Sequence, residues 1–381
     1  MWISTTALYW SSLGVVAYTY AGYPLLINVL SRLRPRPSSE ALDAFEPVVT
    51  VVLAARNEEA RLAGKLENLL ALDYPAEKRQ IIVVSDGSTD GTDELVGRYA
   101  HRGVELVRLD PAGGKARAIN AAVARARGEL LLFCDARQRI DPQALRSLVR
   151  VFTDPAVGAA SGELMLGREQ GPGLYWSYEK LIRQAEGRFD SVVGATGALY
   201  AIRRALFREL PEGCLLDDVF VPMSVVRQGS RVLFVPTAQV FDDEAAIEGE
   251  FSRKARTLAG NFQLLTQLPW LLDPRENRLW MQFVSHKLLR LVCPFALATL
   301  FASNVALVAT GAPGWPLYAA TLAAQLGVYG LAAYAQLAGP AEVGRLARVS
   351  HTFVALNAAA VEGLRRFLIG DLGWTTHRAP A

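Results

Sequence analysis

Short runs of aliphatic and β-branched residues alternate with helical segments between residues 48 and 135, and this alternation restricts the fold more than any other feature. Residues 48–55 and 80–85 are continuous apolar runs bounded by polar turns, and leucines recur at helical spacing within residues 58–72. The alternation continues through residues 104–109, 115–127 and 129–135. Continuous apolar strands separated by helices predict an α/β domain with a parallel sheet that is covered on both faces.

Long apolar segments flank this domain. Residues 6–30 are almost uncharged and exceed the ~20 residues that cross a hydrocarbon core. Two more apolar runs, 291–310 and 317–337, are separated by the short turn at residues 311–315. A signal peptide is the competing interpretation of residues 6–30. The segment lacks the positively charged start and the small-residue cleavage site of a signal peptide. We therefore expect an N-terminal transmembrane helix and a transmembrane hairpin.

Basic residues beside these segments predict their orientation. Arg32, Arg34 and Arg36 follow the first segment, and Arg345 and Arg348 follow the hairpin. The hairpin is preceded by the cations Arg275, Arg278, His286, Lys287 and Arg290, whereas its turn carries none. Cations near a span favour the cytoplasmic side. We expect a multi-pass protein of the cell (inner) membrane, with its N-terminus outside and its catalytic domain and C-terminus in the cytoplasm.

The last apolar stretch, residues 349–369, differs because it contains His351, Glu362, Arg365 and Arg366. Charged residues of this kind favour an amphipathic helix at the membrane interface over a lipid-facing span. The predicted domains are an N-terminal helix, a catalytic domain, an interfacial segment with the hairpin, and an interfacial helix with the tail, at residues 1–31, 46–270, 275–338 and 341–381.

Charge and cysteine content argue against a nucleic-acid-binding protein, a cysteine metal site and a disulfide framework. The net charge of +3 in 381 residues gives no basic field for a nucleic-acid partner. Cys134, Cys214 and Cys293 have neither metal-ligand nor disulfide-framework spacing, so we interpret them as free thiols in a reducing compartment.

Polar residues stand where the predicted strands end, which is where ligands bind in such sheets. Arg56, Asp86 and Asp135 all fall at these ends. Asp86 could accept hydrogen bonds from a uracil-like base, or its loop could be a plain turn in which Asp90 caps the next helix. Residues 113–115, Gly-Gly-Lys, open a helix whose N–H groups and cation suit a diphosphate, although an ordinary loop-to-helix turn explains them equally well.

Asp217 and Asp218 form the second acidic site, and the cationic run from Arg253 to Arg256 follows it. Carboxylates and cations on an α/β frame are what a protein needs to hold a nucleotide-sugar and to deprotonate a hydroxyl group. Adjacent acids also raise one another's pKa, which suits a general base. The alternative is that both acids only begin a helix over residues 219–227.

The order of these motifs resembles the inverting family 2 glycosyltransferases, the membrane-bound relatives of cellulose and hyaluronan synthases. The resemblance covers residues 48–262 and rests on seven segments in the same order: 54–59, 83–90, 114–115, 133–135, 196–203, 216–218 and 253–256. It implies a GT-A (Rossmann-like) fold with a nucleotide-binding half followed by an acceptor half.

The resemblance also implies roles for individual residues. Asp218 would be the general base and Asp217 its acidic neighbour. The donor is expected to be a nucleotide-sugar, namely a UDP-sugar, and it would be bound by Arg56, Glu58, Asp86, Lys115, Asp135, Arg137, Arg253 and Arg256. The acceptor would lie over Thr196, Gly197 and Ala198. Asp135 would be the first carboxylate of the Asp-x-Asp element and a ligand of Mg²⁺ or Mn²⁺.

Two departures from the family pattern bear on mechanism. Arg137 replaces the second carboxylate of Asp-x-Asp, and a cation cannot ligate a metal. Either Asp135 holds the ion together with phosphates and water, or the Arg137 guanidinium supplies the positive charge itself. The Gln-x-x-Arg-Trp motif of processive synthases has no clear copy, so processivity is not implied.

These features together predict a membrane-bound inverting glycosyltransferase that moves a sugar from a nucleotide-sugar to a lipid-linked or polysaccharide acceptor. One alternative is a transferase that loads polyprenyl phosphate with a single sugar. A sugar nucleotidyltransferase is an alternative from another class, but it would carry its glycine-rich loop after the first strand and would leave the membrane segments unexplained.

Overall fold

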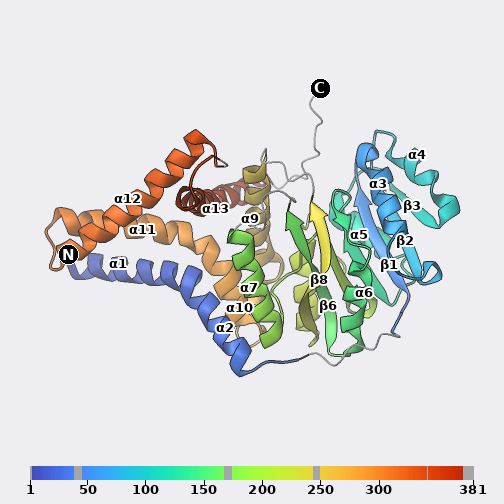
Figure 1. The fold of residues 1–381 in the computed structure, drawn as a ribbon, viewed down its shortest axis with the longest axis horizontal. Coiled ribbons are helices and arrows are strands. Elements are labelled where there is room, and N and C mark those ends of the chain that lie inside the picture. Colours follow the sequence, from blue (N-terminus) through green and yellow to red (C-terminus); the bar gives the residue numbers. More distant parts are fainter. Residues whose placement is uncertain (1, 38–44, 167–173, 243–248, 341, 372–381) are drawn as a thin grey trace.

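The computed structural model describes residues 2–37, 45–166, 174–242, 249–340 and 342–371. Long helices from both ends of the chain lie together on one side of the molecule, and a sheet covered by shorter helices forms the other side (Figure 1). Helices α7 (Leu174–Phe189), α9 (Glu250–Gln267) and α10 (Trp280–Phe283) lie between these two parts.

Within the described residues, eight strands form one sheet in the order β3-β2-β1-β4-β7-β6-β8-β5. Strands β1 (Val49–Ala55), β2 (Arg79–Asp86), β3 (Val104–Leu109) and β4 (Leu130–Cys134) are parallel, as predicted. The other four strands are β5 (Arg139–Ile140), β6 (Val157–Leu166), β7 (Leu199–Arg203) and β8 (Arg231–Asp242). Strand β7 is antiparallel to both β4 and β6, whereas β6 and β8 are parallel. The prediction of a parallel sheet covers residues 48–135 and is confirmed there. It does not extend to this half, since apolar runs indicate strands but not the direction of their pairing.

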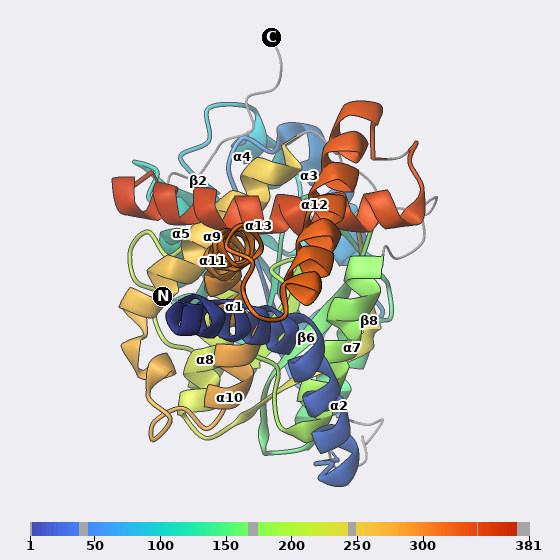
Figure 2. The ribbon, with the colours of Figure 1, turned by 90° about the vertical axis from the view of Figure 1, so that its left-hand side faces the viewer.

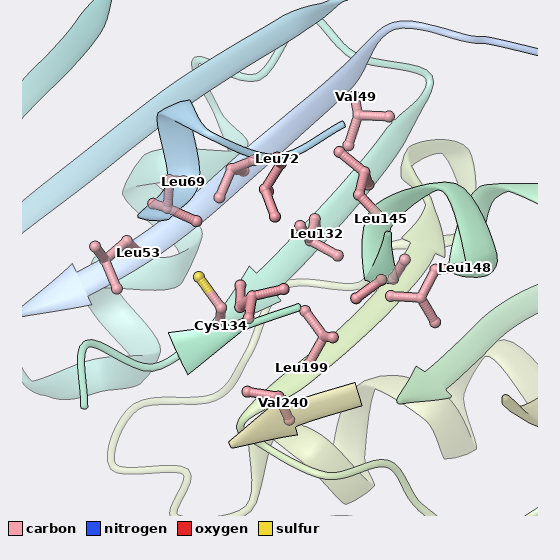
Figure 3. Packing of buried hydrophobic residues seen from close by; sticks show 14 of the residues in the cluster. Val49, Leu53, Leu69, Leu72, Leu132, Cys134, Leu145, Leu148, Leu199 and Val240 are labelled. Carbon is pink, nitrogen blue, oxygen red and sulfur yellow. The ribbon is translucent and has the colours of Figure 1, made fainter. Parts of the chain in front are cut away.

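Helices cover both faces of the sheet because consecutive strand residues point to opposite faces. Leu53 and Leu132 belong to one buried cluster, and their neighbours Val52 and Leu131 belong to another. The first cluster is covered by α3 (Glu59–Leu70), α4 (Thr92–Gly97) and α6 (Ala144–Arg150), and the second by α5 (Gly114–Val123), α8 (Asp217–Arg227) and α9. Figure 3 shows Leu69 and Leu145 packing against strand residues of the first cluster.

The N-terminal helix is continuous from Trp2 to Leu33, with a π-helical turn (Tyr18–Gly22) between α1 (Trp2–Ala17) and α2 (Tyr23–Leu33). Further along the chain, α10 continues through a second π-helical turn, η7 (Val284–Leu288), into α11 (Leu289–Ala309), and α12 (Trp315–Ala338) follows. In the described chain, Ile3–Leu33 and Trp280–Ala309 are long and apolar enough to cross a membrane. Helix α12, the second arm of the predicted hairpin, does not pass the same criterion.

The last helix, α13 (Arg345–Ile369), takes a different course, since it runs across α1 and α11 instead of along them (Figure 2). It packs against α9, and the backbones of the two helices approach closely at Gly363. A Cβ atom at Gly363 would lie 2.8 Å from the backbone nitrogen of Ala259 and 2.9 Å from the carbonyl oxygen of Ala255. The charged residues noted in the sequence pair within the helix, because Glu362 accepts hydrogen bonds from Arg365 and Arg366.

Candidate active site

The carboxyl ends of β2, β1 and β4 lie side by side, and they bring the predicted residues to one edge of the sheet. Arg56 follows β1, Asp86 ends β2, and Asp135 follows β4. Asn57 links the first two loops, since its side-chain oxygen accepts a hydrogen bond from the backbone N–H of Thr89 at 2.8 Å. Asp90 accepts hydrogen bonds from the N–H groups of Thr92, at 3.0 Å, and Glu59, at 3.2 Å, so the predicted cap is present.

Asp86 is fully buried, and its carboxylate binds the start of α5. The backbone N–H groups of Gly113 and Gly114 donate to its two oxygens at 2.6 and 2.9 Å. The expectation that these N–H groups are free for a diphosphate is therefore wrong in this structure. Gly114 has a φ of +86°, a conformation that favours glycine and turns the loop toward Asp86. Asp86 thus fixes the loop that presents Lys115.

Lys115 lies at the centre of the acidic residues. Its Nζ atom is 3.0 Å from Oδ1 of Asp135 and 3.1 Å from Oδ1 of Asp217. Burial lowers the pKa of Lys115, but the nearby carboxylates of Asp135, Asp217 and Asp218 outweigh this effect and raise the pKa above its usual range. The ammonium group joins the strand-end acid to the acid pair on α8, which are distant in sequence.

Asp217 and Asp218 form the first turn of α8, where the helix dipole favours negative charge. Asp217 is almost fully buried and accepts a hydrogen bond from the Tyr200 hydroxyl at 3.0 Å. Asp218 is partly exposed and accepts one from the backbone N–H of Gly197 at 3.1 Å. Burial and the negative charge of Asp217 raise the pKa of Asp218 to about 6. Asp218 is thus largely deprotonated at neutral pH while still able to take up a proton.

The turn before β7 lies directly against these acids. A Cβ atom on Gly197 would be 3.3 Å from Oδ2 of Asp218 and 3.8 Å from Oδ2 of Asp135, so a side chain here would enter the space between the two carboxylates. The preceding Thr196 donates its backbone N–H to the Ser161 hydroxyl at 3.0 Å, and Ala198 is buried. The three residues predicted to lie under an acceptor are therefore next to the predicted base.

Arg253 and Arg256 lie one turn apart on α9. Arg256 is partly buried, and among the described residues its Nε atom has no hydrogen-bond partner. Burial lowers the pKa of Arg256, while the negative charges of Asp217 and Asp135 oppose this shift. Helix α9 therefore contributes a cation near Asp217 and Asp135.

Arg137 points to a residue that sequence reasoning missed. Its guanidinium pairs with the buried carboxylate of Asp242 at the end of β8, and the side chain of Gln138 donates to the same oxygen. The charge of Arg137 is thus balanced within the protein. Nearby, burial raises the pKa of Glu58, helped by the negative charge of Asp135. The Nε atom of Arg56 is buried and lacks a hydrogen-bond partner in the described structure.

The fit of a metal ion depends on Asp135. Its Oδ1 pairs with Lys115, its side chain is 38% exposed, and Oδ2 faces Gly197. Across the residues that the structure describes, no group of three or more His, Cys, Asp or Glu side chains could hold a metal ion. Asp135 can therefore serve as a single carboxylate ligand, and most of the coordination shell would come from the substrate and water.

Residues 50–210 match the family described as glycosyl transferase family 2. Curated relatives include a beta-monoglucosyldiacylglycerol synthase of Synechocystis, 29% identical over 162 residues, and a poly-beta-1,6-N-acetyl-D-glucosamine synthase of Staphylococcus aureus, 30% identical over 202 residues. These alignments cover 42% and 50% of this chain but only 33% and 48% of the relatives. The chain thus matches between a third and a half of their length.

The fold is also similar to a solved structure, a mannosyltransferase of Pyrobaculum calidifontis in complex with GDP-Man and Mn²⁺. That likeness has a TM-score of 0.74 at 24% identity and covers 95% of this chain and 99% of the other. A sheet of this topology with acids at its strand ends, the family match and the shared fold lead to one conclusion. Residues 50–210 match the glycosyl transferase family 2 domain, and the chain has the GT-A fold that it shares with the mannosyltransferase.

Proposed function

We propose that this protein is an inverting glycosyltransferase of the cell membrane, which moves a sugar from a nucleotide-sugar to a lipid-linked or polysaccharide acceptor. The observation that carries the proposal is the position of Asp218. It lies between the Gly197 turn and the cations Lys115 and Lys287, and burial beside Asp217 holds its pKa at about 6. A base with this pKa can accept the proton of an acceptor hydroxyl at neutral pH.

In the proposed reaction, the acceptor oxygen attacks the anomeric carbon of the donor sugar as its proton passes to Asp218. The bond from that carbon to the diphosphate oxygen breaks, and the nucleoside diphosphate leaves with the electron pair. Lys115 and Arg256 stabilise the developing negative charge, and Arg253 adds a further cation on α9. One displacement with one base inverts the configuration at the anomeric carbon.

We also propose that the donor is held at the ends of β1, β2 and β4. Asp86 positions Lys115 through the Gly113-Gly114 loop, and Arg56 and Glu58 line the same edge. The proposed acceptor floor is formed by Thr196, Gly197 and Ala198. A sugar between these groups would present its anomeric carbon to Asp218.

A divalent ion, Mg²⁺ or Mn²⁺, is proposed as a cofactor, supported by the Mn²⁺ bound to the structurally similar mannosyltransferase. Asp135 would be its protein ligand, and the ion would neutralise the charge of the leaving diphosphate. Because Arg137 already pairs with Asp242, we favour an ion at Asp135 over a guanidinium that replaces it. EDTA should abolish transfer and added Mn²⁺ or Mg²⁺ should restore it; full activity of a metal-free enzyme would overturn this assignment.

For the membrane arrangement we propose three spans, an interfacial α13 and a cytoplasmic catalytic domain, with the domain limits expected from the sequence. The support is the distribution of cations around the apolar segments. Single cysteines near Ser4 and Ala312 should be labelled from outside the cell, and one near Ala379, which lies outside the described residues, should not. Labelling of the last site from outside would show that α13 spans the membrane.

A panel of UDP-, GDP- and dTDP-sugars tests the proposed function. Membranes containing the protein should convert one donor into a product that is extracted with lipids or with a membrane-bound glycan, and Asp218→Asn membranes should not. Sugar appearing only in water-soluble small molecules would contradict the proposed acceptor class.

A further inference from the structure

A second pair of cations lies near Asp218, one on α7 and one in the segment Trp280–Ala309, which is long and apolar enough to cross a membrane. Arg183 on α7 and Lys287 in η7 have no ion-pair partner within the described parts of the chain. Both are partly buried. The positive charge of Lys287 acts on Asp218, and the negative charge of Asp218 acts on Arg183. We call these two residues the membrane-side cations, and Lys115 and Arg256 the donor-side cations.

Arg183 is held in place by neutral groups. Its guanidinium lies over the ring of Phe234, 4.6 Å from the ring centroid, and one nitrogen donates to the Ser161 hydroxyl at 2.6 Å. Ser161 also accepts the backbone N–H of Thr196, the residue before Gly197. One serine therefore connects Arg183 to the turn under the proposed acceptor. No described carboxylate balances the charge of Arg183 in an ion pair.

Lys287 is positioned by its neighbours, and they use the nearby acids. His286 is buried and contacts Glu179 at 3.1 Å and Glu186 at 2.8 Å through its two ring nitrogens. Arg290 pairs with the other oxygen of Glu179, and Glu186 also accepts the hydroxyl hydrogen of Tyr23. The acids of this cluster thus fix the helices, whereas Lys287 makes no hydrogen bond to any described residue.

The two pairs of cations come from different parts of the fold. The donor-side cations interact with Asp135 and Asp217, which lie at the strand ends and the first turn of α8. Among the membrane-side cations, Arg183 comes from α7 and is influenced by Glu179, Glu186, Asp218 and Glu163. Lys287 comes from the segment that is long and apolar enough to cross a membrane, and it is influenced by Asp218 and Glu179. Neither cation donates a hydrogen bond to a carboxylate of the described residues, so both keep donors with which they can bind an anionic ligand. A ligand reaching them from the bilayer would arrive beside the base.

We propose that Arg183 and Lys287 bind the phosphate of a lipid acceptor and so select acceptors whose headgroup is anionic. This inference rests on the proposed function and specifies its acceptor. Guanidinium and ammonium groups recognise phosphate by charge-assisted hydrogen bonds. Two lipids share this chemistry: a polyprenyl phosphate, whose own phosphate oxygen would attack the anomeric carbon, and a saccharide linked to a polyprenyl diphosphate, whose hydroxyl would attack while Asp218 takes its proton.

The test uses the full chain in phosphatidylcholine vesicles that contain a polyprenyl phosphate, a polyprenyl diphosphate saccharide, or diacylglycerol. Lys287→Gln should raise the KM for the phosphate-bearing acceptor about tenfold or more, the effect of losing a charged hydrogen bond. The KM for the donor should stay unchanged, and Lys287→Arg should restore most of the affinity for the acceptor. Arg183→Gln should act in the same direction. Transfer to the polyprenyl phosphate would identify its phosphate oxygen as the attacking atom, and transfer to the polyprenyl diphosphate saccharide would identify a sugar hydroxyl.

Arg345→Gln is the matched control, because Arg345 is an exposed cation at the start of α13 and lies outside the site. It should leave both KM values unchanged, and Lys287→Gln should keep the melting temperature of the parent protein. Transfer to diacylglycerol alone, with an unchanged KM in Lys287→Gln, would overturn the phosphate site but leave the glycosyltransferase reaction standing. Absence of product with every lipid and glycan acceptor would instead overturn the proposed function.

Discussion

The donor side and the membrane side of this protein hold their charges in different ways. On the donor side, Lys115 bridges Asp135 and Asp217, so these three charges are paired before any substrate arrives. On the membrane side, Arg183 and Lys287 have no ion-pair partner in the described structure, although acids that bind other residues lie close by. A cation that is already paired with a carboxylate must give up that contact to bind a substrate, whereas a cation with no such contact can bind an anion directly. The comparison favours an acceptor that carries a negative charge of its own, which the sequence alone does not indicate.

The largest expected effect is the loss of turnover when Asp218, which lies near both pairs of cations, is replaced. Asp218→Asn should lower the turnover number by roughly 10²- to 10⁴-fold, because it removes a general base. Donor affinity, measured by calorimetric titration with the nucleoside diphosphate, should stay close to that of the parent protein. Glu276→Gln, at an exposed acid that pairs with Arg227, is the control. An Asp218→Asn enzyme that keeps more than half of its turnover would remove Asp218 from the mechanism.

The next effect concerns the buried pair on the donor side. Arg137→Ala should reduce the free energy of unfolding by about 3 kcal/mol, since it leaves the Asp242 carboxylate buried and unpaired. Adding Asp242→Asn should recover most of this loss in thermal unfolding. Arg137→Asp, which rebuilds an Asp-x-Asp sequence, should be worse than alanine because two carboxylates would then face each other. A stable Arg137→Asp enzyme with raised activity would show that this position binds a metal.

A smaller effect is expected for the loop that carries Lys115. Asp86→Asn replaces an acceptor of two backbone N–H groups by a side chain that can accept only at its oxygen. Losing a hydrogen bond to a charged group amounts to roughly 1.5 to 3 kcal/mol, so the Kd of the nucleoside diphosphate should rise about tenfold or more. Asp141→Asn, at a loop acid beyond the site, should leave this Kd unchanged. Equal affinity in Asp86→Asn and the parent would mean that the loop does not contribute to donor binding.

The smallest effect is a displacement along the pH axis. Because Asp218 must be deprotonated to accept a proton, kcat should fall as the pH drops through about 6 and reach a plateau above it. Asp217→Asn removes a neighbouring negative charge, so the pKa of Asp218 should decrease and the falling limb should move to lower pH, by about one unit. The pH dependence of kcat in both enzymes measures this shift. If the acidic limb of the kcat profile lies at the same pH in both enzymes, the titrating group is not Asp218.

The two sides also differ in how far the sequence predicts them. Asp86 and Asp135 were placed at strand ends correctly, because a strand and the residue after it form a local pattern. The hydrogen bonds of Asp86 to the Gly113-Gly114 loop were missed, since the sequence does not show which loop folds over which strand end. The pairing of β6, β7 and β8 was missed for the same reason.

The membrane side was predicted least well. The sequence indicates only that His286, Lys287 and Arg290 are cations that orient a span. It gives no signal for Arg183, which lies within a mostly polar helix. Tyr200 and Asp242 look like ordinary strand residues. Their partners, Asp217 and Arg137, lie 17 and 105 residues away in the chain. Single polar residues acquire a role only from neighbours that tertiary folding supplies.

The close contact of α13 with α9 at Gly363 connects the helix that we propose to lie at the membrane interface to the candidate active site. Arg253 and Arg256 belong to the helix on which α13 rests, and the backbones touch without intervening side chains. If α13 lies at the interface as proposed, a change in the lipid surface that displaces α13 should displace α9 and its two arginines as well. Donor affinity measured in vesicles of different curvature should then depend on the curvature of the membrane.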